Sequence, residues 1–331
     1  LDLGYRSSDI ELDLRGSIDP NPTDSIGLRV LNLNGQEVDV PLDVRITRSQ
    51  DPPTALRERI WERPDRFLIS REEHASRFPQ DVYDNENDPL TWPGQGVVLE
   101  RNQHRANGRR LQLAEIRDWD VGSYLIEAEA TDESGRKVKV RKHFTVYDIT
   151  IQNTGFANEA FHVEQVNVTA EPGDKASFLL SSALPEAHVL MEIERDGAIV
   201  ISRWFELNNG QQLVELPALE GDRGGFFVHL LCVERGRAHR ETITINVPWS
   251  NKDLRVEWMS FRDKLQPGDS EEWRLKINGP KGEKVASQLL AAMYDASLDH
   301  FVPHGWDMSI WPANHAQRGW SRTEPFGANS G

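Results

Sequence analysis

Cysteine is almost absent from the sequence, with one residue in a chain of 331. A single thiol cannot form a disulfide within the chain or supply a cysteine-rich metal site. Positive charge is also scarce, since 38 Lys and Arg stand against 53 Asp and Glu for a net charge of −15. An acidic chain repels phosphate backbones, and no apolar run reaches the roughly 20 residues of a membrane-spanning helix. We therefore expect neither nucleic-acid binding nor membrane insertion.

What is present indicates ordered domains. Hydrophobic residues make up 38% of the chain, and ten Trp and twelve Phe are more than a disordered segment would carry. The length suits two or three domains of about 100–150 residues each. The sequence opens on Leu1 without an initiator Met, and no strand pattern precedes its end. We expect it to be a fragment of a longer polypeptide, so that the absence of a signal peptide says nothing about compartment.

The dominant hydrophobic period is two, which is typical of half-buried strands. Three hairpins are predicted, with turns at Asn34-Gly35, at residues 132–135 and at Asp196-Gly197. For Asn34-Gly35 we expect a type I′ turn between strands at 26–33 and 38–46, because both residues tolerate positive φ. Short strands separated by such turns predict an all-β fold of antiparallel sandwiches.

Residues 50–105 break the alternation and hold six prolines. Ser70 followed by Glu73 forms a capping box, which predicts a short helix through Phe78 that Pro79 ends. We interpret this segment as a partly helical insertion in the first sandwich. Long insertions are often functional or lie against a neighbouring domain, and we expect such a contact here.

A weak internal repeat divides the chain. Pro-Gly-Asp occurs at 172–174 and again at 267–269, each time between two strand-like runs. Recurrence at about one domain length predicts tandem copies of one sandwich. The expected domains are residues 1–148 with the insertion, residues 149–248, and a truncated copy at 249–331.

Several segments together resemble the macroglobulin domains of the bacterial α2-macroglobulin family, especially its large Bacteroidetes-type members. They are residues 171–182, 220–227, 247–256, 261–269 and 294–299, with parts of the insertion from Trp61 to Pro89. The resemblance covers most of residues 20–310 and implies immunoglobulin-like or fibronectin-like sandwiches.

Family members are large secreted or membrane-anchored protease traps that collapse around a protease when it cuts their bait region. The resemblance implies that this chain is a structural framework fragment without catalysis of its own. It further implies a periplasmic, cell-surface or secreted location. The implied partners are host or competitor proteases, met through the full-length protein, and neighbouring domains of the same chain.

The family's thioester joins the Cys and Gln of a Cys-Gly-Glu-Gln motif. Residues 232–235 read Cys-Val-Glu-Arg, so that Arg235 stands where the acyl donor would be. Cys232 also alternates with Leu230 on an apolar strand, and free cysteines are commonly buried. We predict a buried core cysteine and no thioester.

Two groups of residues resemble metal ligands. His300 and His304 have the spacing of a helical pair, with Asp295 and Asp299 nearby, but Pro303 and Gly305 oppose a continuing helix. The carboxylates of Asp81, Asp84, Glu86 and Asp88 cluster without the spacing of an EF-hand, which favours a solvated turn over a calcium site. We predict no catalytic residue, metal site or cofactor, because no nucleophile elbow, phosphate loop or dinucleotide motif is present.

Large aromatic residues in polar surroundings are the predicted packing anchors between domains or partners: Trp61, Phe78, Tyr83, Trp92, Trp306 and Trp311. The alternative function is a carbohydrate-binding or adhesive sandwich array, in which exposed tryptophans stack on sugars. A weaker alternative is a hydrolase with its site in the insertion.

Overall fold

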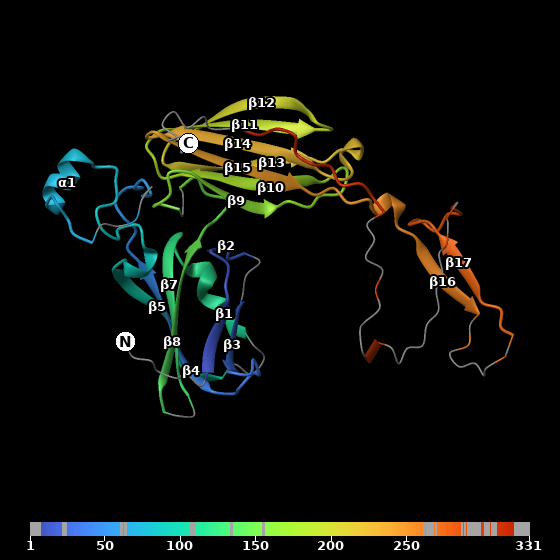
Figure 1. The fold of residues 1–331 in the computed structure, drawn as a ribbon, viewed down its shortest axis with the longest axis horizontal. Helices are drawn as coiled ribbons and strands as arrows, with labels where there is room; N and C mark the ends of the chain where they lie inside the picture. The colour runs from blue at the N-terminus through green and yellow to red at the C-terminus, as the bar shows by residue number, and fades with distance from the viewer. Residues whose placement is uncertain are drawn as a thin grey trace, which may run out of the picture.

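The computed structural model describes residues 8–21, 25–59, 62, 65–105, 110–132, 135–153, 156–260, 262, 268, 270–285, 287, 289, 299–300, 305 and 310–320. These residues form two β-sandwiches followed by a two-stranded sheet that is set apart from them (Figure 1). The predicted all-β fold of tandem antiparallel sandwiches is confirmed. In the described part of the chain, no helix has the length and apolar character needed to cross a membrane.

The first sandwich packs a three-stranded sheet, in the order β1-β3-β6, on a five-stranded sheet, in the order β2-β8-β7-β4-β5. Its strands are β1 (Ser8–Asp13), β2 (Ser17–Ile18), β3 (Ser25–Asn32), β4 (Pro41–Ser49), β5 (Gly94–Arg105), β6 (Arg110–Gln112), β7 (Gly122–Thr131) and β8 (Lys137–Val146). All pairs are antiparallel except β2 with β8. Alternate residues of β3 and β4, such as Leu28, Val30, Val44 and Ile46, fill the core between the sheets.

The second sandwich has seven strands, in sheets ordered β13-β10-β9 and β12-β11-β14-β15. They are β9 (His162–Asn167), β10 (Lys175–Ser182), β11 (Ala187–Arg195), β12 (Ala198–Leu207), β13 (Gly210–Pro217), β14 (Phe226–Glu234) and β15 (Arg237–Ile245). Its core includes Phe178 of β10, Val189 of β11 and Cys232 of β14, each without exposed surface. The two sheets therefore bury one continuous apolar layer, as an immunoglobulin-like sandwich does.

Apart from the additional strand β2 of the first, the two sandwiches share a strand order, but they differ at one hairpin. In the second, β11 turns directly into β12 at Asp196 and Gly197, whose φ values of 49° and 72° fit the predicted Asp-Gly turn. In the first, the corresponding strands β4 and β5 are adjacent, with Ser49 opposite Gly94. The chain between them, residues 50–93, takes the place of a tight turn.

The insertion is thus shorter than the sequence pattern predicts, because residues 94–105 form β5. This strand lies at the edge of its sheet, and most of its residues are exposed. An edge strand with little burial needs no regular alternation of apolar residues, which is why the pattern did not reveal it.

The predicted Asn34-Gly35 hairpin forms only next to its turn, where Leu31 bridges Glu37 in antiparallel fashion and the Val38 N–H donates to the Val30 carbonyl at 2.9 Å. β3 pairs with β1 and β6, whereas β4 lies in the other sheet. A tight turn does form, with the Gly35 N–H donating to the Asn32 carbonyl at 2.9 Å, but of the two residues only Gly35, with φ of 74°, has positive φ, so the turn is not the predicted type I′. The strand after it crosses to the second sheet, and a local turn signal cannot predict that crossing.

The predicted helix is α1 (Arg71–Arg77), which Ser70 caps by accepting the Glu73 N–H at 3.2 Å. Short 3-10 helices cover Pro89–Thr91, Ala114–Asp118, Glu220–Asp222 and Ser250–Lys252. Beyond the second sandwich, β16 (Arg255–Ser260) pairs with β17 (Arg274–Asn278). These two strands lie within the range of the predicted third copy, whose residues 294–298 are outside the described part of the chain.

Candidate interdomain site

A polar network joins the two sandwiches where β2 meets β9. The Ser17 hydroxyl of β2 donates to the Glu164 carboxylate of β9. The same carboxylate oxygen lies 3.3 Å from Nε2 of His162, and Nδ1 of His162 lies 2.9 Å from the Glu159 carboxylate. The imidazole also stacks on Phe156, with ring centroids 3.6 Å apart. One imidazole thus bridges two carboxylates, and one of these reaches the first sandwich.

The surroundings of His162 favour its charged form. Burial pulls the pKa of its imidazole down, but the hydrogen bonds and negative charges of Glu159 and Glu164 outweigh burial and raise the pKa to about 9. His162 is therefore a cation at neutral pH. An imidazolium between two carboxylates gives charge-assisted hydrogen bonds on both ring nitrogens.

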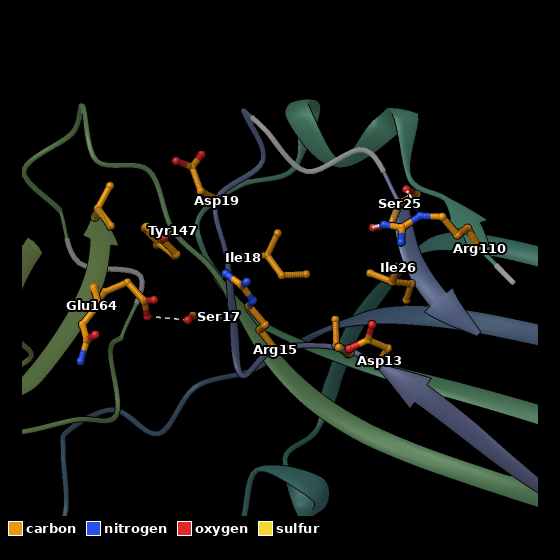
Figure 2. Close-up of a pocket in the computed structure, with 13 residues that line it drawn as sticks. Asp13, Arg15, Ser17, Ile18, Asp19, Ser25, Ile26, Arg110, Tyr147 and Glu164 are labelled. Carbon is orange, nitrogen blue, oxygen red and sulfur yellow. Dashed lines mark hydrogen bonds between the residues drawn. The ribbon is translucent and has the colours of Figure 1, made fainter. Parts of the chain in front are cut away.

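A cavity of about 520 Å³ opens beside this network (Figure 2). Its lining comes from both sandwiches, with Arg15, Asp19 and Arg110 on one side and Glu164 on the other. Figure 2 shows Ser17 and Glu164 pointing toward each other across the junction, while Arg110 turns to Ser25, whose hydroxyl accepts from its Nε at 2.7 Å. The cavity is polar and charged, which suits bound water better than an apolar ligand.

The chemistry of this site does not match nucleophilic catalysis. In a catalytic triad the imidazole stands between the hydroxyl and the carboxylate, so that it can take the hydroxyl proton. Here the carboxylate of Glu164 stands between Ser17 and His162. The hydroxyl thus meets a structural acceptor, and the imidazole is already protonated. The arrangement holds two domains together and does not activate Ser17.

A second junction lies between the insertion and the second sandwich. Nη1 of Arg57 donates to the Arg235 carbonyl at 3.0 Å, and Nη1 of Arg235 donates to the Ala55 carbonyl at 2.6 Å. Asp81 orients Arg57 by accepting from its Nη2 at 2.8 Å. Ala55 is 1% exposed and belongs to the apolar cluster of the second sandwich. The insertion is therefore fixed to a neighbouring domain.

The segment that connects the two sandwiches is also held by hydrogen bonds and apolar packing. Nε2 of Gln211, on β13, donates to the carbonyls of Asp148 and Ile151 at 2.6 and 3.0 Å. Tyr147 and Phe156 form a small buried cluster with Leu179 of β10. Contacts on the linker, on β2 and on the insertion together restrict the angle between the sandwiches.

Cys232 lies in the core of the second sandwich, as predicted, and is free. Burial raises the pKa of its thiol to about 12, so the nucleophilic thiolate is scarce at neutral pH. Arg235, three residues later, occupies the tight turn before β15 with φ of 49° and points its side chain to the insertion. Arg235 thus makes an interdomain contact.

The acidic cluster in the insertion is engaged by protein groups. Asp81 binds Arg57, Glu86 binds Arg71, and the Asp88 carboxylate accepts the Leu90 N–H at 3.0 Å. Glu86 also accepts the N–H groups of Tyr83 and Asp84. These contacts give Asp81, Glu86 and Asp88 partners within the protein.

The predicted aromatic anchors occupy different places. Trp92 is buried, donates from Nε1 to the Glu86 carbonyl at 2.8 Å and packs edge-on against His143 of β8. Tyr83 stacks on Phe67 within the insertion, and Phe78 is 46% exposed beside His74. Trp92 thus connects the insertion to the first sandwich, while Tyr83 and Phe78 order the insertion itself.

Trp311 stacks on Trp249 with ring centroids 6.0 Å apart. Trp61 and Trp306 lie outside the described residues, as do His304 and Asp295 of the predicted metal-like group. Where the structure describes the chain, no three His, Cys, Asp or Glu side chains gather as metal ligands would.

The residues that join the domains were not predicted individually. Ser17, Arg57 and His162 are polar residues of ordinary appearance in the sequence. One signal was available, since His162 follows Glu159 by three residues and precedes Glu164 by two, and residues two apart share one face of a strand. The partners of Ser17 and Arg57 are far away in sequence, and no local pattern marks them.

Comparison with known proteins gives similarity at low scores. No protein-family model and no curated protein matches the sequence. Native α2-macroglobulin of E. coli aligns with 80% of this chain at 13% identity and a TM-score of 0.26. The fibronectin(III)-like modules of Clostridium thermocellum CbhA align with 72% of it at 10% identity and a TM-score of 0.18, and the match covers 94% of that chain.

A tetra-tandem repeat from the extending region of a large adhesion protein aligns with 76% of this chain at 13% identity and a TM-score of 0.23, over 52% of that chain. The chain spans 15% of the E. coli α2-macroglobulin. At these scores the similarities assign neither a family nor a function.

Proposed function

We propose that this chain is a framework module of a larger α2-macroglobulin-like protease trap and has no catalytic activity of its own. The observation that carries the proposal is the double junction between the first two sandwiches, through Ser17 and Glu164 on one side and through Arg57 and Arg235 on the other. Both junctions use polar side chains for domain fixation. The role of the chain is then to hold neighbouring parts at set positions.

The segments that resemble macroglobulin domains support this proposal by their position. The Pro-Gly-Asp turn at 172–174 leads into β10, and Gly225 with φ of 102° leads into β14. Residues 247–256 connect the second sandwich to β16. These three resembling segments are therefore strand starts and a domain connection, which a framework would retain.

A framework module of a trap must also keep its domains at a fixed angle to one another. Domains that share small polar interfaces usually move relative to one another. Here the insertion, the linker and β2 all contact the second sandwich, and several separate contacts restrict rotation more than one would. We propose that this stiffness transmits a change in one part of the full-length protein to its neighbours.

The proposal includes a location and partners. The full-length protein would act in the periplasm, at the cell surface or outside the cell, and its targets would be proteases of a host or competitor. The neighbouring domains of the same polypeptide would be the direct partners of this chain.

The test uses the full-length protein that contains this chain. Limited digestion with trypsin should change its mobility on a native gel, and the trapped protease should lose activity on large substrates while it still cuts small peptides. Trypsin with a blocked active-site serine is the matched control and should cause neither change. Unaltered mobility together with uninhibited trypsin would rule out a trap.

The alternative, a carbohydrate-binding or adhesive array, is favoured by one observation. Trp204 on the edge strand β12 is 64% exposed, and Trp258 on β16 is 53% exposed. Exposed indole faces can stack on sugar rings. Retardation of this chain in polysaccharide-containing gels, lost in Trp204→Ala or Trp258→Ala, would favour this function over the trap.

A further inference from the structure

The outer face of the sheet β12-β11-β14-β15 carries a segment from the end of the chain. Residues 312–320, here called the strap, run beside β11 and β14 without forming a strand or helix, as the red trace shows (Figure 1). At one end, Nε1 of Trp249 donates to the Pro312 carbonyl at 2.9 Å. Asn314 donates from its backbone N–H and from Nδ2 to the carbonyls of Gly224 and Gly225, at 3.0 and 2.7 Å.

The middle of the strap meets an ionisable pair. Glu194 of β11 and His229 of β14 have side chains that are 2% and 1% exposed, and their Oε2 and Nε2 atoms lie 2.8 Å apart. Val189, Met191 and Ile193 fill the core from the other face of β11. A carboxylate on the outer face of a sheet is normally solvated, so its burial needs a covering group.

The strap provides that cover through its backbone. The N–H of Gln317 donates to Oε1 of Glu194 at 2.8 Å, and the N–H of Arg318 donates to Oε2 at 3.0 Å. Burial raises the pKa of Glu194, but the two backbone N–H groups and His229 outweigh burial, and the pKa ends below its usual range. One carboxylate thus binds two consecutive amides, a contact that recognises backbone direction.

Side chains add selectivity around this contact. Nε of Arg318 donates to Glu192 of β11 at 2.9 Å. The Trp320 ring stands edge-on to His229 with centroids 6.0 Å apart, and its carbonyl accepts from Nη1 of Arg240 at 3.2 Å. The surface therefore fits an extended segment with an arginine two residues before a tryptophan.

The strap is held mainly by hydrogen bonds and not by apolar packing. Its residues are exposed apart from Asn314 and Trp320, which are half-buried, so little apolar surface is removed from water. If it leaves, Glu194 and His229 become surface groups that water can solvate, and no unpaired charge stays buried. Both features favour reversible binding over permanent packing.

We propose that this outer face is a peptide-binding site whose ligand is the chain's own strap, bound in cis and able to detach. Glu194 and His229 form the centre of the site, Glu192 and Arg240 flank it, and Gly224 and Gly225 hold the start of the peptide. The ligand is an extended segment that offers two consecutive N–H groups, an arginine and a tryptophan. This inference does not depend on the proposed trap.

Hydrogen exchange of the strap amides in the whole chain tests the proposal. In Glu194→Gln the carboxylate becomes an amide with one acceptor oxygen, and exchange at Gln317 and Arg318 should speed up roughly tenfold or more. Glu215→Gln is the matched control, because Glu215 lies on β13 in the opposite sheet and is exposed beside Lys175. Exchange at Gln317 and Arg318 that is unchanged in Glu194→Gln would overturn the site.

A second variant, with the substitution on the strap itself, tests the proposal even if Glu194→Gln destabilises the whole second sandwich. Arg318→Ala leaves every strand intact and should speed exchange at Gln317 while the amides of β10 keep their protection. Equal protection at Gln317 in Arg318→Ala and the parent chain would overturn the proposal.

A separate experiment tests whether the strap can be replaced by a free peptide. A labelled peptide of residues 310–320 should bind Arg318→Ala more tightly than the parent chain, because the weakened strap competes less for the site. A peptide of the same composition in scrambled order should bind neither. Failure of the correct peptide to bind either chain would show that the strap is fixed packing, which overturns the proposed site.

Discussion

Arg57 and Arg235 clasp each other across the boundary between the insertion and the second sandwich. Arg57 donates to the carbonyl of Arg235 at 3.0 Å, while Arg235 donates to the carbonyl of Ala55, two residues before Arg57, at 2.6 Å. Each guanidinium group donates to a backbone carbonyl oxygen, so the contact between these two cationic residues does not require their side-chain charges to meet. Asp81 neutralises Arg57, and the pair joins segments almost 180 residues apart.

The first prediction concerns this clasp. Arg235→Ala should lower the free energy of unfolding by about 1.5–3 kcal/mol, the usual value of a hydrogen bond from a charged donor. Hydrogen exchange at residues 55–59 should rise in the same variant, because the insertion loses one of its contacts to β14 and β15. Chemical denaturation and exchange measure the two effects.

Arg77→Ala is the control for the clasp. Arg77 is an exposed residue of α1, paired with Glu73 one turn earlier, and such a pair is worth about 0.3–0.5 kcal/mol. Equal losses of stability in the two variants would contradict an interdomain role for Arg235.

The second prediction concerns the thiol. Because Cys232 has no exposed surface and burial raises its pKa to about 12, it should react with a thiol reagent at pH 8 only when the chain unfolds. Arg235→Gln places a glutamine three residues after Cys232, but Cys232 faces the core. Thiol titration in denaturant should therefore still find one free thiol per chain. Loss of that thiol would contradict the structural assignment of Cys232.

The third prediction is a pH dependence at the junction. The pKa of His162 is about 9 in the folded chain and near 6.5 when unfolded, so the folded state binds its proton more tightly. Its contribution to stability is complete below pH 6.5 and is lost as pH rises through 9. We expect His162→Gln to cost on the order of 2–3 kcal/mol at pH 6 and much less at pH 10.

Urea denaturation of the parent chain and His162→Gln across this pH range measures the effect. His188→Gln is the matched control, because His188 lies in the same sandwich with its side chain half exposed. A stability difference for His162→Gln that does not change with pH would contradict a charged imidazole at the junction.

The fourth prediction concerns calcium. Asp81, Glu86 and Asp88 already bind Arg57, Arg71 and the Leu90 N–H. Millimolar calcium should therefore leave the melting temperature of the chain unchanged. Asp81→Asn should lower it with or without calcium, because Arg57 loses its carboxylate partner. A calcium-dependent rise in the parent chain that Asp81→Asn abolishes would establish an ion site instead.

Local signals in the sequence predicted local structure well. Ser70 and Glu73 indicated the start of α1, and Asp196-Gly197 indicated a tight turn between two neighbouring strands. These predictions hold because the energy of a cap or a turn depends on a few consecutive residues.

Local sequence patterns did not predict strand pairing where the pairing depends on strands far away in the sequence. Asn34-Gly35 forms a turn, but β4 after it joins the other sheet, where it pairs with β5 and β7. β5 itself carries no clear alternation, because an edge strand can leave both faces exposed. Pairing of this kind is decided by which strands compete for the same backbone groups, and a local pattern does not contain that competition.

The candidate site shows the same division. The sequence predicted large aromatic residues as packing anchors between domains or partners. Of these, Tyr83 orders the insertion and Trp92 joins the insertion to the first sandwich. The junction with the second sandwich uses Ser17, Arg57 and His162. Polar residues are common on every surface, and their roles follow from partners that the folded chain brings within hydrogen-bond distance.

From composition, periodicity and local motifs follow an acidic, all-β chain of tandem sandwiches, a capped helix in an insertion and a buried cysteine. These properties rest on short-range preferences and on burial of alternating apolar residues. The clasp of Arg57 with Arg235, the charged state of His162 and the strap on Glu194 arise only in the folded molecule. Each depends on how far the fold excludes water from the groups involved and on hydrogen-bond donors that are far apart in sequence. Both are decided only by the three-dimensional arrangement of the chain.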